Sequence, residues 1–281
     1  MIVCADDFGL REDIDQAILE LCSLGKLSAV SCLVVLARCN SEAIGRLTAH
    51  PLGVDVGLHL CLTDEGLPPP LSASGRKSIR SSFTSLFRYA SPGGLRSREV
   101  FQQVSAQYEL FVQKSGRRPD HIDGHLHAHQ LPAVRCGLLD FVLSLPADRR
   151  PYIRNTYMPL SEIRRQGLPW MKAFPIGVYG ARMRRDLVAA GLPTNDGFVG
   201  IYDFKRWRRY PCYLPKFADC LRRHGPNSIL VVHPGMRENW RSQEYESLRT
   251  LSLPGTEPNR FQKGMEGGAN RQCVSAEQPR Q

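Results

Sequence analysis

The sequence opens with MIVCADDFG, residues 1–9. The apolar run at 2–5 is long enough for a buried strand and too short for a helix, and it ends abruptly in Asp6 and Asp7. Two neighbouring carboxylates at the end of a buried strand repel each other, and burying them is costly unless a metal ion, an arginine or a proton neutralises them. The stretch therefore predicts a central strand with a functional site at its carboxyl end.

Three later stretches share this form, because each is a strand-like run with histidine at or near its carboxyl end. They are GVDVGLHL at 53–60, PDHIDGHLHAH at 119–129 and SILVVHPG at 228–235. Ligand sites in parallel α/β folds lie at the carboxyl ends of the strands. We therefore expect one site to gather five side chains: Asp6, Asp7, His59, His125 and His233.

The segments between these runs have apolar residues at helical spacing. Helices are predicted over 11–25, 41–50, 97–114, 132–145 and 216–224, and further short strands over 27–36 and 152–154. This alternation of strands and helices predicts an α/β fold with parallel strands and helical crossovers. The stretch from Asn155 to Pro211 remains ambiguous, because its short apolar pieces are interrupted by Gly, Pro and Arg.

Two segments stand apart from one β/α domain expected over 1–252. Residues 63–94 are rich in Pro, Ser and Gly, which is typical of a long insertion or a lid over a site. Residues 253–281 are polar, rich in Gly and Pro and without periodicity, so we expect a disordered C-terminal tail.

Composition narrows the class of protein. No apolar run reaches the ~18 residues that span a bilayer, and the chain begins on a strand rather than a signal peptide, so we expect a cytoplasmic protein. The nine cysteines are scattered without CxxC spacing, which argues against a disulfide framework and a zinc ribbon. The net charge is +10, but no nucleic-acid-binding motif accompanies it, so we expect no nucleic-acid partner.

The spacing of the polar residues limits their roles. Neighbouring side chains of a strand point to opposite faces, so Asp6 and Asp7 can serve one metal ion only where the strand turns into a loop. If the strand continued through the histidine-rich stretch, His125 and His129 would lie ~13 Å apart. One carboxylate and two imidazoles leave coordination positions open, as a hydrolytic metal site requires. A second carboxylate could then act as general base and another histidine as general acid.

The ordered motifs ADDFG, GLHL, DGHLHAH followed by Pro132, and HPG resemble those of the YdjC-like (ChbG/HpnK) carbohydrate deacetylases. The resemblance runs from about Met1 to Gly235. It implies a single-domain, distorted TIM-like β/α barrel. It also implies a hydrolase of carbohydrate metabolism that removes N-acetyl groups from amino sugars, of chito-oligosaccharide or glycolipid type, with one divalent metal ion.

The resemblance also implies individual roles. Asp7, His59 and His125 would bind the metal, which could be magnesium or zinc; Asp6 would be the base and His233 the acid. The remaining site residues, Arg154, His127 and His129, would contact substrate.

Other readings of the residues stay open. A metallo-phosphoesterase or another amidohydrolase could use a similar barrel, and such sites often hold two metal ions. A non-catalytic sugar- or anion-binding barrel would keep the fold without the chemistry. The sequence also leaves open a homodimer and a peripheral contact with a membrane.

Overall fold

A computed structural model describes residues 1–51, 53–62 and 96–250. Its seven strands form one parallel sheet in the order β5-β4-β3-β2-β1-β7-β6, so the N-terminal strand lies near the middle. The strands are β1 (Ile2–Phe8), β2 (Ala29–Cys32), β3 (Asp55–Leu60), β4 (His121–Gly124), β5 (Tyr152–Ile153), β6 (Phe198–Val199) and β7 (Ile229–Val232). Because all strands are parallel, their carboxyl ends lie at the same end of the sheet.

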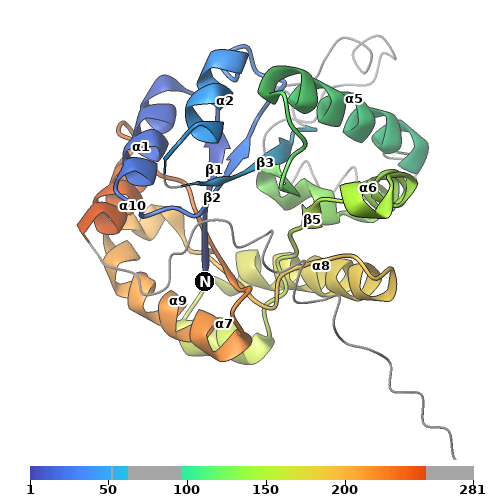
Figure 1. Ribbon diagram of the computed structural model, residues 1–281. Helices are drawn as coiled ribbons and strands as arrows, with labels where there is room; N and C mark the ends of the chain where they lie inside the picture. The colour runs from blue at the N-terminus through green and yellow to red at the C-terminus, as the bar shows by residue number, and fades with distance from the viewer. Residues whose placement is uncertain (52, 63–95, 251–281) are drawn as a thin grey trace, which may run out of the picture.

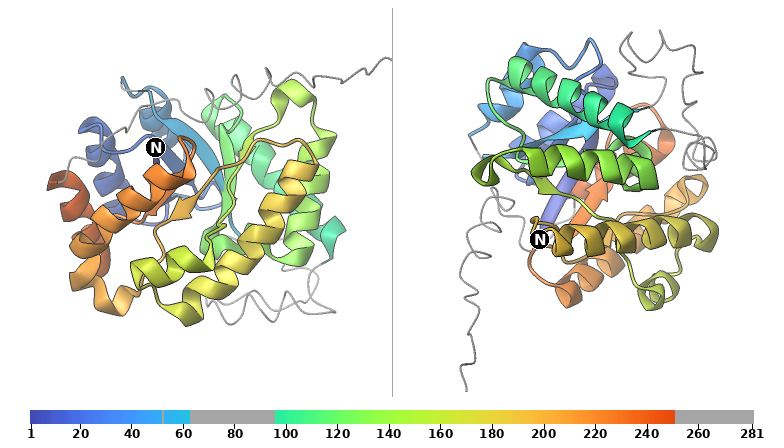
Figure 2. Two further views of the ribbon diagram at one scale, coloured as in Figure 1. Left: turned by 90° about the horizontal axis from the view of Figure 1, so that it is seen from below. Right: turned by 90° about the vertical axis from the view of Figure 1, so that its right-hand side faces the viewer.

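Helices surround the outer side of the curled sheet (Figure 1). They are α1 (Glu12–Ser23), α2 (Ser41–Thr48), α5 (Ser97–Ser115), α6 (Pro132–Ser144), α7 (Leu160–Gln166), α8 (Trp170–Ala189), α9 (Tyr210–His224) and α10 (Asn239–Thr250). Short 3₁₀ turns lie at η1 (His125–Gln130), η2 (Ala147–Arg149) and η3 (Phe204–Arg209). The views in Figure 2 show the same arrangement from below and from the side.

The two edges of the sheet approach each other where β5 meets the segment before β6. An isolated bridge pairs Ile153 with Thr194. Next to it, Asn155 N donates to Asn195 Oδ1 over 2.8 Å and Asn195 Nδ2 donates to the Asn155 carbonyl oxygen over 2.9 Å. The sheet is thus a curled, incompletely closed half-barrel, which confirms the predicted α/β fold of a distorted TIM-like barrel.

The two faces of the strands differ in polarity. Val3, Ala5 and Ile122 belong to the apolar core of the protein. Cys4 and Asp6 alternate with Val3 and Ala5 on β1 and are also buried, and their side chains take part in the polar network inside the barrel that is described below. Alternation along a strand explains this division, because successive side chains point to opposite faces.

Most predicted elements are present with shorter strands than expected. The second strand ends at Cys32 rather than Leu36, because the apolar residues after it are buried in turns instead of pairing. The ambiguous stretch from Asn155 to Pro211 contains α7, α8 and β6. Pro175 lies inside α8, which explains why no helical pattern was evident there.

Two predictions fall outside the described residues, namely the insertion at 63–94 and the tail at 253–281. Within the described ranges, no helix combines the length and the apolar composition needed to cross a bilayer.

Candidate active site

The adjacent carboxylates lie where β1 becomes irregular. The register of β1 against β2 shifts between Ala5 and Phe8, and Asp7 has a left-handed backbone with φ 71°. This irregularity is the turn that the alternation rule required, because it lets Asp6 and Asp7 border one cavity. Gly9 follows with φ 93°, and a Cβ there would lie 2.5 Å from Cys39 Cβ, so only glycine fits this turn.

Two histidines meet the Asp7 carboxylate. His125 Nδ1 lies 2.9 Å from Asp7 Oδ1, and His59 Nε2 lies 3.5 Å from the same oxygen. One atom from each of these three residues lies within 4.8 Å of the other two. All three side chains are buried. The sequence placed them at three separate strand ends, and the fold brings them together.

The strand predicted through DGHLHAH ends at Gly124. Leu126 and His127 then adopt left-handed backbone conformations, with φ 54° and 58°. The chain therefore turns sharply, and His125 and His127 both border the cavity. His129 turns away instead, where its Nε2 lies 2.9 Å from the Arg154 carbonyl oxygen in the interior. An extended spacing of ~13 Å therefore does not apply to this stretch.

Arg154 approaches the site from inside the barrel. Its side chain is fully buried and binds Asp6 in a two-bond fork, with 2.8 Å for both Nη1–Oδ1 and Nη2–Oδ2. Nη2 also lies 2.9 Å from Asp123 Oδ2. Such forked pairs fix a carboxylate in orientation as well as charge. Arg154 thus holds Asp6 in place from behind, on the side away from the cavity.

His233 is the first residue after β7, and it faces Asp6 across the cavity with 4.0 Å between Nε2 and Oδ2. Its backbone N–H donates to Glu244 Oε2 over 2.5 Å. Burial lowers the pKa of His233 to about 4, although Asp7 and Asp6 act in the opposite direction. The free imidazole is therefore neutral at neutral pH.

Asp7, His59 and His125 form the candidate ligand trio. The surroundings of Asp7 and His59 favour the charged form of each side chain. Burial would raise the pKa of Asp7, but Arg241 and His125 outweigh it and hold the pKa well below its ordinary value. Burial would lower the pKa of His59, but Asp123 and Asp6 outweigh it and raise the pKa to about 9. His59 Nδ1 donates to Asp123 Oδ1 over 2.6 Å. That bond leaves Nε2, on the Asp7 side, as the atom that would bind a metal once it has lost its proton.

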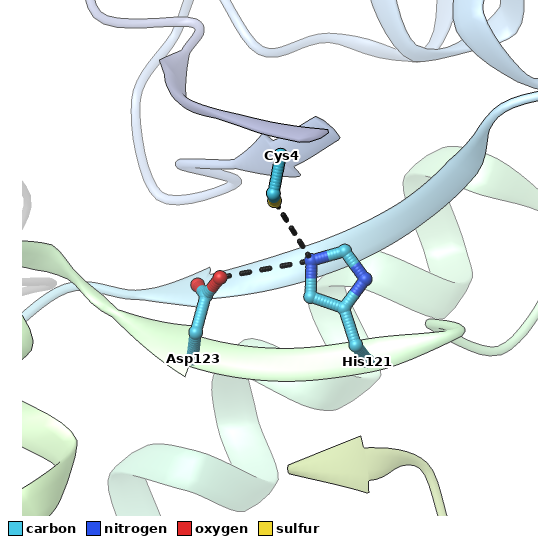
Figure 3. A group of neighbouring side chains, drawn as sticks. All are labelled: Cys4, His121 and Asp123. Atoms are coloured by element: carbon cyan, nitrogen blue, oxygen red, sulfur yellow. Dashed lines mark hydrogen bonds and ion pairs between the residues drawn. The ribbon is translucent and has the colours of Figure 1, made fainter. Parts of the chain in front are cut away.

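A polar layer supports the site from below, and Figure 3 shows Cys4 on β1 pointing toward His121 and Asp123 on β4. His121 Nε2 lies 3.8 Å from Cys4 Sγ and 3.6 Å from Asp123 Oδ2. The Ser31 hydroxyl lies 2.9 Å from His121 Nε2 and donates to Asp123 Oδ2 over 2.6 Å. Because Ser31 and Arg154 already occupy the Asp123 oxygen, we interpret this group as a hydrogen-bonded support for Asp123 rather than a metal site.

Gly57 on β3 leaves the space that the His121 side chain occupies. A Cβ on Gly57 would lie 2.3 Å from His121 Nε2, so the imidazole occupies the space beside β3 that any other side chain would fill. Burial lowers the pKa of His121, which therefore remains neutral.

Sequence reasoning missed three residues around the site. Arg241 on α10 places Nη2 2.7 Å from Asp7 Oδ2, and Lys172 on α8 borders the cavity. Neither lies in a motif, so only the tertiary structure reveals them. Asp123 is part of the DGHLHAH motif, two residues before His125, and that shared strand face is the signal that could have identified it as the partner of a ligand.

One wall of the cavity is a column of two stacked rings with a cation at each end. Lys172 Nζ lies 3.6 Å from the centre of the Phe204 ring, which stacks on Trp240 at 4.3 Å between ring centroids. The Arg241 guanidinium lies 4.4 Å from the centre of the Trp240 ring. Cation–π contacts of this kind are worth about 0.5–2 kcal/mol each. The column therefore fixes a cation at each of its ends.

The cavity at this end of the barrel has a volume of about 280 Å³. Its lining combines the polar site with apolar side chains: Asp6, Asp7, His59, His125, Leu126, His127, Lys172, Ile176, Phe198, Gly200, Ile201, Phe204, Val231, His233, Trp240 and Arg241. Small-molecule sites usually pair a few convergent polar groups with an apolar wall in this way.

The sequence matches the family described as YdjC-like protein over residues 1–256. The chain belongs to the YdjC-like family. This confirms the resemblance carried by its four ordered motifs, which contain Asp6, Asp7, His59, His125 and His233.

Proteins similar to this YdjC-like chain include three named deacetylases. A human carbohydrate deacetylase is 33% identical over 252 residues, which cover 84% of this chain and 74% of the human protein. Chitooligosaccharide deacetylases from Escherichia fergusonii and Enterobacter sp. strain 638 are 29% and 33% identical over 57% and 48% of the chain. These last two matches span only 63% and 52% of the bacterial proteins.

A solved structure shares the fold of this YdjC-like chain. It is a putative cellobiose-phosphate cleavage protein from Enterococcus faecalis, with a TM-score of 0.59, 19% identity and coverage of 95% of this chain and 94% of that one. At this level of identity the likeness supports the fold alone.

Proposed function

We propose that this protein is a metal-dependent hydrolase that removes N-acetyl groups from amino sugars. The observation that carries the proposal is the convergence of Asp6, Asp7, His59, His125 and His233 on one cavity. These residues come from four strand ends, and their types match the parts needed for hydrolysis of an amide. The names of the similar deacetylases support the choice of substrate.

The ligand trio fits a divalent metal ion. Asp7, His59 and His125 offer one oxygen and two nitrogens within 4.8 Å of one another, and Asp123 orients His59 as carboxylates do around metal-bound histidines. Three protein ligands leave room for water and substrate, and the donor set suits zinc while tolerating magnesium. A metal held by these residues would supply Lewis acidity, lowering the pKa of a water molecule and polarising the acetyl carbonyl.

The protein's own residues then handle the protons. Asp6, held by Arg154, accepts the proton of the attacking water. His233, on the other side, donates a proton to the sugar nitrogen as the amine leaves. Because the free His233 is neutral at neutral pH, the proton that it donates is the one that Asp6 takes up, across the 4.0 Å between the two groups.

The rest of the cavity suits an N-acetylated sugar. Ile176, Phe198 and Ile201 supply apolar surface for the acetyl methyl group and the faces of the sugar ring. His127 and Lys172 lie on the same lining and offer polar atoms to hydroxyl groups. Binding in this cavity would bring the amide to the polar end formed by Asp6 and His233.

The test is acetate release from chito-oligosaccharides by the wild type and Asp6→Asn, each with and without a chelator. Asp140→Asn on α6, an exposed acid away from the cavity, is the matched control. We expect metal-dependent release that is lost in Asp6→Asn and retained in Asp140→Asn, because general-base catalysis contributes about 10²–10⁴-fold. Wild-type activity in Asp6→Asn would refute the role of the base, and release that resists chelation would refute the metal.

A further inference from the structure

A second group of ligand-type side chains lies between α7 and α9, away from the cavity. Glu162 and Gln166 are four residues apart on α7, and Cys220 and His224 are four residues apart on α9. Residues at this spacing share one face of a helix. One atom each from Glu162, Cys220 and His224 lies within 4.8 Å of the other two. Two helices thus present paired polar side chains to one another.

Two buried atoms in this group lack partners. Gln166 is 1% exposed, and its Oε1 has no hydrogen-bond partner among the described residues. The amide nitrogen of Gln166 lies 3.4 Å from Glu162 Oε2, so the amide borders the cluster. His224 Nε2 is likewise buried without a hydrogen-bond partner in the described part of the chain. Unsatisfied buried polar atoms cost about 1–3 kcal/mol each, and a ligand bound between the two helices would relieve that cost.

The carboxylate of the group is held by two arginines. Arg223 Nη2 binds Glu162 Oε2 over 2.9 Å, and Arg165 Nε lies 3.8 Å from Glu162 Oε1. The Cys220 side chain is buried, and burial together with Glu162 raises the pKa of its thiol to about 12. Metal binding would deprotonate it and release the proton to solvent. The thiolate would then add a second negative ligand to the Glu162 carboxylate.

We propose that Glu162, Cys220 and His224 form a zinc site, with the Gln166 amide oxygen as fourth ligand. Sulfur, nitrogen and oxygen donors in a closed four-ligand set are typical of zinc. No residue of the group borders the catalytic cavity. The site is therefore structural: it would fasten α7 to α9.

A zinc ion joining α7 to α9 would affect the cavity only indirectly. α8 follows α7 in the chain and carries Lys172 and Ile176 to the cavity wall. Loss of zinc should thus lower stability around α7 while leaving the chemistry of the ligand trio in place.

Cobalt titration of the metal-free full chain tests the proposal. A cysteine thiolate bound to Co²⁺ gives a sulfur-to-cobalt charge-transfer band in the near ultraviolet, and the catalytic trio contains no cysteine. We expect this band in the wild type and in Cys212→Ser, whose exposed cysteine lies on the same helix. We expect it to be absent from Cys220→Ser, with one fewer equivalent of bound metal and catalytic activity retained.

Zinc provides the second readout, because it should raise the melting temperature of the wild type more than that of His224→Ala. The absence of the charge-transfer band from the wild type at saturating cobalt would overturn the proposal without any variant. A band that persists in Cys220→Ser would also overturn it, because the sulfur would then belong to another cysteine. Neither result bears on the deacetylase proposal, which acetate release tests separately.

Discussion

Replacement of Arg154 by methionine tests the physical basis of the site most sharply. Arg154 is fully buried and makes the fork to Asp6 and a third contact to Asp123. The substitution keeps an unbranched side chain that is shorter than arginine and uncharged, so it leaves two buried carboxylates without their cation. Breaking a buried pair in this way costs about 3–5 kcal/mol, against a total stability of about 5–15 kcal/mol for a domain. We therefore expect a loss of about 4 kcal/mol.

The assay is chemical denaturation of the metal-free protein, with Arg135→Met as the matched control. Arg135 pairs with Asp186 over 2.8 Å, but Asp186 is 26% exposed, whereas Asp6 is 2% exposed. Solvent screens the more exposed pair, so the control should lose only about 1 kcal/mol. Saturating metal should recover part of the loss in Arg154→Met, because a cation beside Asp7 also neutralises Asp6.

The loss of stability in Arg154→Met should depend on pH in a definite direction. Burial would raise the pKa of Asp123, but Arg154 and His59 outweigh it and lower the pKa. A carboxylate with a lowered pKa contributes stability above its unfolded value of about 3.9 and loses it as the pH falls. The deficit of Arg154→Met should therefore be full at neutral pH and shrink toward pH ~4, where the unpaired acids can protonate. A loss no larger than that of Arg135→Met, or one independent of pH, would refute this account of the barrel interior.

Three further results are expected. Asp123→Asn should weaken metal binding about 10–100-fold by calorimetry, because His59 loses the carboxylate that orients it; unchanged affinity would contradict this. His233→Ala should reduce kcat about 10²–10⁴-fold with little change in KM, since only proton donation is lost; wild-type turnover would exclude His233 as the acid. Burial raises the pKa of Glu244 to about 7, so between pH ~4.5 and 7 the folded protein holds a proton that the unfolded chain has lost. The free energy of unfolding should therefore fall by about 3 kcal/mol as the pH rises through that window. Glu244→Gln should flatten the curve, and an unchanged slope would show that another group is responsible.

Much of the fold follows from periodicity in the sequence. The apolar runs ending in Asp6–Asp7, His59 and His233 are buried parallel strands, as predicted, because such runs separated by helical patterns favour βαβ units. The stretch from Asn155 to Pro211 could not be interpreted in this way. Pro175 and the glycines of α8 obscure its period, and Gly180 is there because a Cβ would lie 2.4 Å from the backbone of Thr156.

The assembly of the candidate site was also partly predictable. The rule that parallel strands bring their carboxyl ends together was enough to group Asp6, Asp7, His59, His125 and His233 around one cavity. The sequence did not indicate that the histidine-rich strand ends at Gly124, because left-handed conformations at Leu126 and His127 depend on the surrounding packing. That turn separates His127, on the cavity, from His129, in the interior.

Residue type and alternation along a strand are local properties, so they already specify which chemical groups stand at the strand ends. How the charges of these groups are balanced depends on the tertiary fold. Arg154 reaches Asp6 from β5 and Arg241 reaches Asp7 from α10, and no local pattern joins residues so far apart in the chain. Electrostatic pairing depends on distance in space and on burial, and both arise only when the barrel closes around the site.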